Sequence, residues 1–416
     1  MRQRNRIQPN AHTLKTLARD SSSMPSVLVC GGGIGGLAAA LALAQQGVRV
    51  KVLEQAQELG EIGAGVQLGP NAFSAFDALG IGESARARAV YTERLLLLDA
   101  IDGSEIANIP VGDAFRARFG NPYAVIHRAD IHLSLLEGVQ QNGQIELETS
   151  TRVERIEQSG NRVAVTDQRG RKFEADAVIG CDGGKSLVRR QYVGDEARVS
   201  GHVVYRAVVD ATEFPADLKQ NAPVVWCGPN CHLVHYPLRG GQQYNVVVTF
   251  HSRQTETWSI TEGSQEEVLT YFTGIVPRAR QLLSLPKSWR RWATADREPI
   301  AQWTFGRATL LGDAAHPMLQ YLAQGACMAL EDSVTLGQAV GASNGDLDAA
   351  FERYQRSRVA RTARVLLMTR EMGRIYHAKG VERLVRNDLW KGRTPERYYD
   401  ALEWLYAWKP ERCLAD

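Results

Sequence analysis

Residues 27–36 read VLVCGGGIGG, a β-prone run that leads into a glycine-rich turn. Three of these glycines fit the pattern G-x-G-x-x-G: Gly31, Gly33 and Gly36. A helix is expected over 37–46, and a second β-prone run follows at 48–53. In such a βαβ unit the first glycine permits the tight turn, the second lets the backbone approach a pyrophosphate, and the third lets helix and strand pack closely. This order predicts a dinucleotide-binding unit.

An acidic residue, Glu54, directly follows the second β-prone run. A carboxylate at that position accepts hydrogen bonds from the adenosine ribose hydroxyls and disfavours a 2′-phosphate. We therefore expect FAD or NAD, and not NADP, on this unit.

Two later segments repeat the order of strand, acidic turn and helix. Asp182 ends one apolar run, and Asp313 follows Leu310, Leu311 and Gly312 at the end of another. Apolar residues at helical spacing then begin at Ala326, so Gly325 lies where free N–H groups point outward. A helix N-terminus of this kind attracts negative charge.

Two further features between these motifs suit a bound dinucleotide. Residues 61–72 form a second glycine-rich stretch, which includes Val66 and suits a loop that passes close to a large flat ligand. Arg128 opens a helix that could place its side chain against a phosphate, although taken alone it fits a surface role better. In this order the pieces predict one extended dinucleotide that is contacted at several places.

Composition restricts the class of protein. The chain has 416 residues, 23% of them charged, with a net charge of +3, which argues against nucleic acid or a membrane surface as partner. No apolar run approaches the roughly 18 residues that a bilayer span needs. The six scattered cysteines do not resemble a disulfide framework, so a reducing cytoplasm is expected.

Four β-prone segments between 203 and 250, separated by Gly, Pro and Asn, predict an antiparallel sheet. In the segment 232–238 the period of two places His232, Val234 and Tyr236 on one face. An imidazole and a phenol about 13 Å apart could hold a phenyl-sized ligand and deprotonate its hydroxyl. A metal is not expected, because the adjacent Cys231 and His232 would point to opposite faces.

Three ordered motifs make the chain similar to the single-component FAD-dependent aromatic hydroxylases, the group of salicylate hydroxylase and 4-hydroxybenzoate hydroxylase. The resemblance extends from about Met24 onward. The motifs are Gly31–Gly36 with Glu54, then Cys181-Asp182-Gly183 with Ser186 and Arg189, and Gly312-Asp313-Ala314-Ala315-His316-Pro317. One departure is Gln55, where many relatives carry arginine.

The resemblance implies an α/β (α+β) fold with a discontinuous, Rossmann-like FAD-binding domain. That domain would comprise 25–200 and 297–365, with a mainly antiparallel substrate-binding β-sheet domain inserted over 201–296. A flexible extension over 1–24 would precede it, and a helical and aromatic segment over 366–416 would follow.

The implied cofactor is FAD, bound tightly but not covalently, with NADH as a transient reductant and O₂ as co-substrate. A flavin C4a-hydroperoxide would then hydroxylate a phenolic aromatic acid. The turn at Asp182 would serve both the flavin and the visiting nicotinamide nucleotide. The residues expected at the FAD are Gly31, Gly33, Gly36, Glu54, Val66, Arg128, Val153, Asp182, Asp313, Gly325 and Ala326.

Within this group the chain resembles the 3-hydroxybenzoate 6-hydroxylases at His232, Tyr236 and Gln320. Most relatives place proline at the position of Gln320, whereas an amide can hydrogen-bond a substrate. The resemblance implies that 3-hydroxybenzoate becomes 2,5-dihydroxybenzoate (gentisate), with His232 and Tyr236 activating the phenol. Gln320 and Tyr123 would orient the acid.

Several alternatives stay open at this point. The chain could be a salicylate 1-hydroxylase or another hydroxybenzoate hydroxylase, or a flavin-binding regulator without turnover. The choice between NADH and NADPH is also open. The arginine-rich helix after Val340 is expected to be solvated or to lie between subunits, and the aromatic C-terminal segment leaves a homodimer open.

Overall fold

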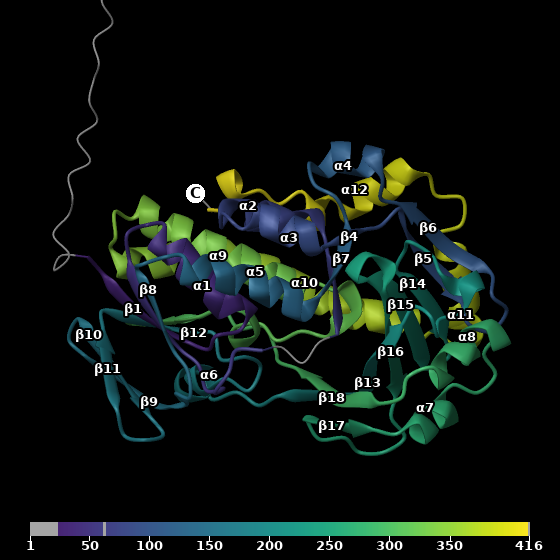
Figure 1. The fold of residues 1–416 in the computed structure, drawn as a ribbon, viewed down its shortest axis with the longest axis horizontal. Helices are drawn as coiled ribbons and strands as arrows, with labels where there is room; N and C mark the ends of the chain where they lie inside the picture. The colour runs from purple at the N-terminus through teal and green to yellow at the C-terminus, as the bar shows by residue number, and fades with distance from the viewer. Residues whose placement is uncertain (1–23, 61–63, 415–416) are drawn as a thin grey trace, which may run out of the picture.

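The computed structural model describes residues 24–60 and 64–414. A six-stranded sheet and a large eight-stranded sheet lie at opposite ends of the molecule, and long helices connect them (Figure 1). The expected N-terminal extension falls outside the described residues, apart from Met24.

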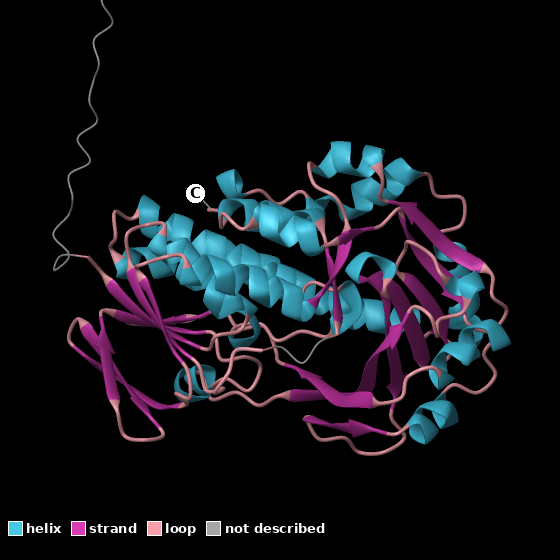
Figure 2. Ribbon diagram, in the orientation of Figure 1, coloured by secondary structure: helices cyan, strands magenta, loops and turns pink. Residues whose placement is uncertain are grey.

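The six-stranded sheet has the order β19-β20-β12-β1-β2-β8 and is parallel except for the edge pair β19–β20. The βαβ unit expected at the N-terminus is present as β1, α1 and β2, with β1 in the middle of the sheet (Figure 2). This confirms the Rossmann-like part of the predicted fold class. The strands are β1 (Ser26–Cys30), β2 (Arg49–Leu53), β8 (Ile145–Glu148), β12 (Ala177–Gly180), β19 (Thr304–Phe305) and β20 (Ala308–Leu310).

The eight-stranded sheet has the order β17-β18-β13-β16-β15-β14-β5-β6 and is antiparallel except for the pair β14–β5. Two of its strands, β5 and β6, come from outside the segment 201–296. The strands are β5 (Arg94–Asp99), β6 (Glu105–Pro110), β13 (Arg198–Asp210), β14 (Val224–Gly228), β15 (Cys231–Leu238), β16 (Gln243–His251), β17 (Ser259–Gly263) and β18 (Trp289–Asp296).

Two three-stranded sheets complete the β structure, with the orders β11-β10-β9 and β3-β7-β4. Their strands are β3 (Gly65–Leu68), β4 (Val90–Tyr91), β7 (Ala124–His127), β9 (Val153–Ser159), β10 (Arg162–Asp167) and β11 (Lys172–Ala175).

The helices α1, α2 and α10 pack against α9, which is the central helix of the molecule. Near the C-terminus, α12 packs on α4 and β6, so the end of the chain returns to its N-terminal half (Figure 1). The helices are α1 (Ile34–Ala44), α2 (Pro70–Ala78), α3 (Gly82–Arg88), α4 (Asp113–Phe119), α5 (Arg128–Gln140), α6 (Leu187–Tyr192), α7 (Gln265–Tyr271), α8 (Pro277–Arg280), α9 (Gly325–Ala342), α10 (Leu347–Tyr376), α11 (Gly380–Leu389) and α12 (Pro395–Tyr406).

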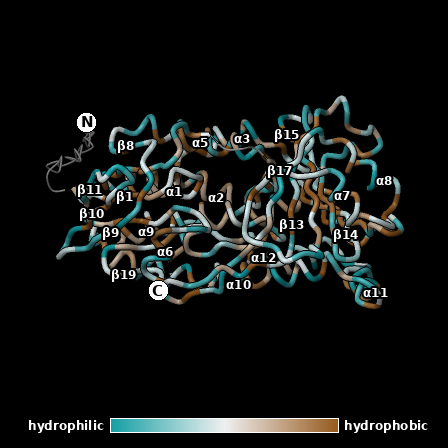
Figure 3. The backbone as a smooth tube through the Cα atoms, turned by 90° about the horizontal axis from the view of Figure 1, so that it is seen from below, coloured by the Kyte–Doolittle hydropathy of each residue, from teal (hydrophilic) through white to brown (hydrophobic). Residues whose placement is uncertain are grey.

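Apolar side chains form three buried clusters. One lies around the six-stranded sheet, one behind the eight-stranded sheet, and the largest lies between them. Hydrophobic stretches lie mainly inside, and the outer turns are largely hydrophilic (Figure 3). Within the described part of the chain, no helix has the length and apolar character that crossing a membrane requires.

Candidate functional site

The glycine turn after β1 has the geometry that its spacing predicts. Gly31 has a φ of 112°, and a Cβ there would lie 2.3 Å from the carbonyl oxygen of Cys181. A Cβ on Gly36 would lie 1.9 Å from the carbonyl oxygen of Gly31, so turn and helix touch. A Cβ on Gly33 would meet nothing within 4 Å. The open side of the turn is therefore at Gly33, where a pyrophosphate needs close access to the backbone.

The carboxylate of Glu54 lies at the end of β2 beside this turn. Its Oε2 accepts from the N–H of Gly32 at 2.6 Å, and its Oε1 accepts from the N–H of Ala56 at 2.8 Å. These bonds fix the carboxylate next to the glycine turn.

Asp182 stabilises the start of α6. Its carboxylate accepts from the N–H groups of Leu187 and Val188, at 2.7 and 3.2 Å, and from the hydroxyl of Ser186. Burial raises the pKa of this carboxyl group. The neighbours Cys181 and Gly183, and not Asp182 itself, line the main cavity.

A cavity of about 560 Å³ runs from the glycine turn to the eight-stranded sheet. Volumes of this size are typical of small-molecule sites. The predicted site residues that line it are Gly33, Val66, Tyr123, Arg128, His232, Tyr236, Asp313, Gln320, Gly325 and Ala326. Five others lie outside its lining: Gly31, Gly36, Glu54, Val153 and Asp182. Val153 begins β9 and packs against the cluster around the six-stranded sheet.

The helix α9 begins at Gly325, as predicted, and its first turn faces the cavity. The N-cap residue Gln324 makes no side-chain capping bond, so the N–H groups of this turn are available to a ligand. Asp313 is exposed in the turn before it and lines both this cavity and a neighbouring one of about 510 Å³. Open backbone at Gly33, an uncapped helix N-terminus and a cationic Arg128 along one cavity suit the diphosphate and ring of FAD.

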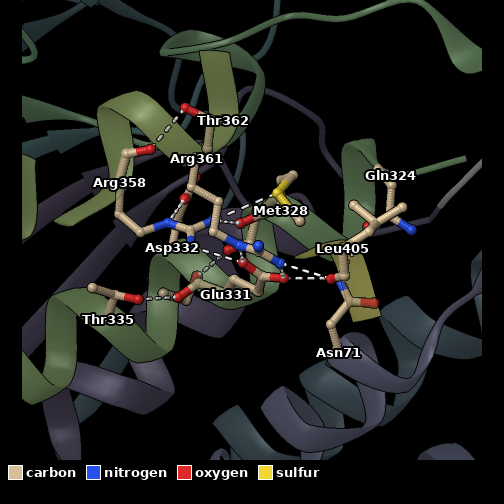
Figure 4. Close-up of polar contacts among 12 residues, drawn as sticks. Asn71, Gln324, Met328, Glu331, Asp332, Thr335, Arg358, Arg361, Thr362 and Leu405 are labelled. Atoms are coloured by element: carbon tan, nitrogen blue, oxygen red, sulfur yellow. Dashed lines mark hydrogen bonds and ion pairs between the residues drawn. The ribbon is translucent and has the colours of Figure 1, made fainter. Parts of the chain in front are cut away.

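Figure 4 shows a buried ionic network in which Glu331 and Asp332 of α9 bind arginines of α10. Asp332 on α9 accepts from the N–H of Gly312 at 3.1 Å and from Nε of Arg358 at 2.6 Å, and its Oδ2 lies 2.6 Å from Nε2 of His316. Burial alone would raise the pKa of Asp332, but His316 and Arg358 hold it below its ordinary value.

The same network corrects the expectation that the arginine-rich helix is solvated or lies between subunits, but only for some of its arginines, since Arg356 and Arg364 are exposed. Arg358 on α10 is fully buried, and its Nη1 donates to Glu331 at 2.7 Å. Arg361 donates to both carboxylate oxygens of Glu331, at 2.7 and 2.8 Å. Buried carboxylates on α9 need cationic partners, and arginines of α10 supply them. The spacing of arginines along α10 does not by itself reveal this pairing.

His232 and Tyr236 lie on the cavity face of β15, with Val234 between them, as the period of two predicts. Nδ1 of His232 lies 2.8 Å from Nε2 of His377, the residue after α10. Burial, together with nearby His202, lowers the pKa of His232 to about 3. His232 is thus a neutral imidazole whose Nδ1 is engaged, which leaves Nε2 for a ligand.

The Tyr236 ring lies against β3. A Cβ on Gly65 would lie 2.4 Å from this ring, so the position requires glycine. Burial raises the pKa of the Tyr236 hydroxyl, which is therefore protonated and able to donate a hydrogen bond.

Gln320 and Tyr123 approach the cavity from other elements. Nε2 of Gln320 donates to the hydroxyl of Thr249 at 3.4 Å, and Thr249 is the direct cross-strand neighbour of His232. The hydroxyl of Tyr123 donates to Oε1 of Gln67 at 2.8 Å. The cavity thus brings together all four residues expected to bind substrate.

Sequence reasoning missed two parts of the cavity wall. Arg206 lines it from β13, and its position inside the β-prone run VVYRAVV was the available signal. The C-terminal segment also lines it, through Tyr376, Trp390, Tyr398, Trp404 and Tyr406. Within the described ranges, no group of three or more His, Cys, Asp or Glu could hold a metal ion.

Comparisons with known proteins agree with this geometry. Residues 24–369 match the model of the family described as FAD binding domain. The 3-hydroxybenzoate 6-hydroxylase of Polaromonas naphthalenivorans (strain CJ2) is 71% identical over 94% of this chain and 97% of that protein. The protein of the same name from Klebsiella oxytoca is 60% identical over 93% of this chain and 98% of its own length.

Solved structures share the fold. Klebsiella pneumoniae HpxO complexed with FAD and uric acid superposes with a TM-score of 0.82 at 24% identity, over 92% of this chain and 96% of that one. A salicylate hydroxylase substrate complex has a TM-score of 0.78 at 25% identity, over 94% and 97% of the two chains.

Proposed function

The chain belongs to this family of FAD binding domains, and on that premise we propose that it is an FAD-dependent monooxygenase that converts 3-hydroxybenzoate to 2,5-dihydroxybenzoate. The observation that carries this proposal is the 71% identity with a 3-hydroxybenzoate 6-hydroxylase over nearly the whole of both chains. The cavity supports it, because His232, Tyr236 and Gln320 all line one continuous wall.

We propose that FAD lies along the wall from the glycine turn to the N-terminus of α9. Gly33 gives the diphosphate access to the backbone, Arg128 supplies a cation, and Asp313 offers a carboxylate to the ribityl hydroxyls. Glu54 lies beside the glycine turn for the adenosine ribose. When bound, FAD supplies the redox chemistry that uses electrons from NADH to activate O₂.

His232 is the proposed base for the substrate phenol. Its Nε2 takes the phenolic proton, and its Nδ1 contact with His377 holds the ring in orientation. The phenolate is electron-rich at the carbon para to its oxygen, which is C6 of 3-hydroxybenzoate. The Tyr236 hydroxyl donates to the phenolate oxygen, while Gln320 and Tyr123, which line the same cavity, orient the acid.

The Asp182 turn, whose neighbour Gly184 lines the second cavity, is the proposed contact for the visiting NADH. We also propose that the protein is cytoplasmic, since all six cysteines are free and five are buried. A homodimer is proposed from the apolar side chains that α11 exposes.

The test is an NADH-consumption screen of the FAD-loaded enzyme with the three hydroxybenzoate isomers and identification of the products. We expect 3-hydroxybenzoate to stimulate NADH oxidation and to yield gentisate. Catechol from salicylate, or tight FAD binding without aromatic-stimulated oxidation, would contradict the proposal.

A matched pair of variants tests the base. His232→Asn should lower the rate of hydroxylation about 10²–10⁴-fold while reduction of the flavin by NADH persists. His235 lies on the opposite face of the same strand, against Phe214, so His235→Asn should retain hydroxylation. Equal rates in the two variants would remove His232 from the mechanism.

A further inference from the structure

Arg206 presents a cation to the cavity and has no ion-pair partner among the described residues. Its side chain lines both cavities, and its Nε is buried with no hydrogen-bond partner. The Trp292 ring centroid lies 5.5 Å from the guanidinium carbon. The titratable and charged groups that act on it are Tyr236 and Arg128. No acidic side chain of residues 24–60 and 64–414 forms an ion pair with it.

The strand register places Arg206 beside the proposed catalytic residues. Arg206 pairs with Val247, and Val247 pairs with Val234, the residue between His232 and Tyr236. Arg206 therefore lies in the middle row of the cavity face, two strands away. With strands about 4.8 Å apart and a rise of about 3.3 Å per residue, the Cα atoms of Arg206 and His232 are about 12 Å apart. Two side chains and one substituted benzene ring can span this distance.

Arg206 is half-buried and its Nε is shielded from solvent, so a ligand that fills the cavity removes the remaining water from the guanidinium. That loss of water is costly unless an anion accompanies the group. Arginine keeps its charge in proteins, so the group cannot escape this cost by losing a proton. Its planar fork matches a carboxylate through two parallel hydrogen bonds. We propose that Arg206 binds the carboxylate of the aromatic substrate.

This inference rests on the proposed function and adds to it a residue that determines specificity. With the phenol at His232 and the carboxylate at Arg206, the ring is held at two points. The two substituents stand farther apart on a meta or para ring than on an ortho ring. Anchors on separate strands therefore disfavour salicylate relative to 3-hydroxybenzoate.

The test compares an acid with its neutral analogue on the FAD-loaded enzyme. Binding of 3-hydroxybenzoate and 3-hydroxybenzamide is titrated through the flavin absorbance, without NADH, for the wild type, Arg206→Gln and Arg206→Lys. Arg206→Gln should weaken binding of the acid by about 10- to 150-fold and leave binding of the amide unchanged. Arg206→Lys should keep part of the preference for the acid.

Arg290→Gln is the matched control, because Arg290 faces Arg206 across β13 and β18 but lines only the second cavity. It should retain the preference for the acid. If Arg206→Gln loses affinity for the acid and the amide equally, Arg206 has only a structural role and the inference is overturned. A shift in flavin reduction potential with unchanged ligand affinities would also overturn it, since Arg206 would then serve the flavin.

The proposed function has a separate outcome. If the wild type hydroxylates 3-hydroxybenzoate but Arg206→Gln keeps the preference for the acid over the amide, the inference about Arg206 is wrong and the proposed function still holds. Wild-type enzyme that hydroxylates none of the isomers would remove the function itself.

Discussion

His232 shows how burial sets the protonation state of one side chain. Its ring contacts His377 and Tyr321, with ring centroids 5.0 and 5.4 Å away. His202 lies in the same group of rings, and burial lowers its pKa to about 4. An imidazolium in this cluster would lack water and an acidic partner, so the resting histidines are neutral. A neutral imidazole is what a base for a phenol must be before reaction.

The same shifts predict a pH dependence of stability. An unfolded histidine takes up a proton below about pH 6.5, whereas His232 in the folded protein has its pKa lowered to about 3. The unfolded state therefore binds more protons in the window between these values, and stability is lost as the pH falls through it. His232→Asn removes one such group, so the variant should lose about 2–3 kcal/mol less than the wild type between pH 6.5 and 4.5.

Urea unfolding at the two pH values measures this difference. The variant is compared with the wild type at each pH. Any effect of the substitution on the free energy of unfolding that does not depend on pH therefore cancels. Parallel losses in the two proteins would show that His232 can be protonated in the folded state.

At the scale of elements, α9 joins the two halves of the site. Its first turn faces the cavity, and Glu331 and Asp332, two turns later, bind Arg358 and Arg361 of α10. Asn71 on α2 also donates to Glu331, at 2.7 Å. Through Asp332, which accepts from the N–H of Gly312, this network reaches the turn that carries Asp313.

Breaking this network should cost far more than removing a surface arginine. Arg358→Ala leaves two buried carboxylates with fewer partners and should lower the free energy of unfolding by about 3–5 kcal/mol. It should also weaken FAD binding, because Asp332 accepts from Gly312 in the turn that carries Asp313, a proposed FAD contact. Arg356→Ala removes an exposed arginine of the same helix and should change stability by less than about 0.5 kcal/mol.

Urea denaturation and FAD titration of the two variants provide the measurement. Equal midpoints in both would mean that the ion pairs of α9 and α10 contribute nothing beyond a surface charge.

At the scale of the whole molecule, the sequence predicts what depends on neighbours in the chain. The glycine turn at Gly31, the start of α9 at Gly325 and the shared face of His232 and Tyr236 all follow from local spacing. The pairing of β14 with β5, more than a hundred residues away, and the return of α12 over the cavity leave no local pattern. Arg206 is an intermediate case. Its strand was predicted from the sequence, but only the assembled sheet shows that no described acidic side chain pairs with it.

The helix α11 reverses the usual arrangement of an amphipathic surface helix. Three of its polar side chains face inward, where Arg383, Arg386 and Asn387 donate to Asp99 at 2.7–2.8 Å. Its apolar side chains face outward, with the exposed fractions Val381 75%, Leu384 61%, Val385 62% and Leu389 46%. A contiguous exposed apolar face of this kind marks an interaction surface, and the commonest partner of such a surface is a second copy of the chain.

Placing a charge on this face should therefore separate the proposed homodimer. Wild-type protein should sediment at twice the chain mass of 45.9 kDa, and Leu384→Lys should sediment as a single chain. The matched control is Ile260→Lys, which alters an equally exposed side chain (63%) on β17 and should leave the dimer intact. Dissociation in both variants would indicate a general effect of charge, and a monomeric wild type at micromolar concentration would rule out the homodimer. If only Leu384→Lys dissociates, the outward apolar face of α11 is the dimer contact, because the inward polar face already holds the helix on its own subunit.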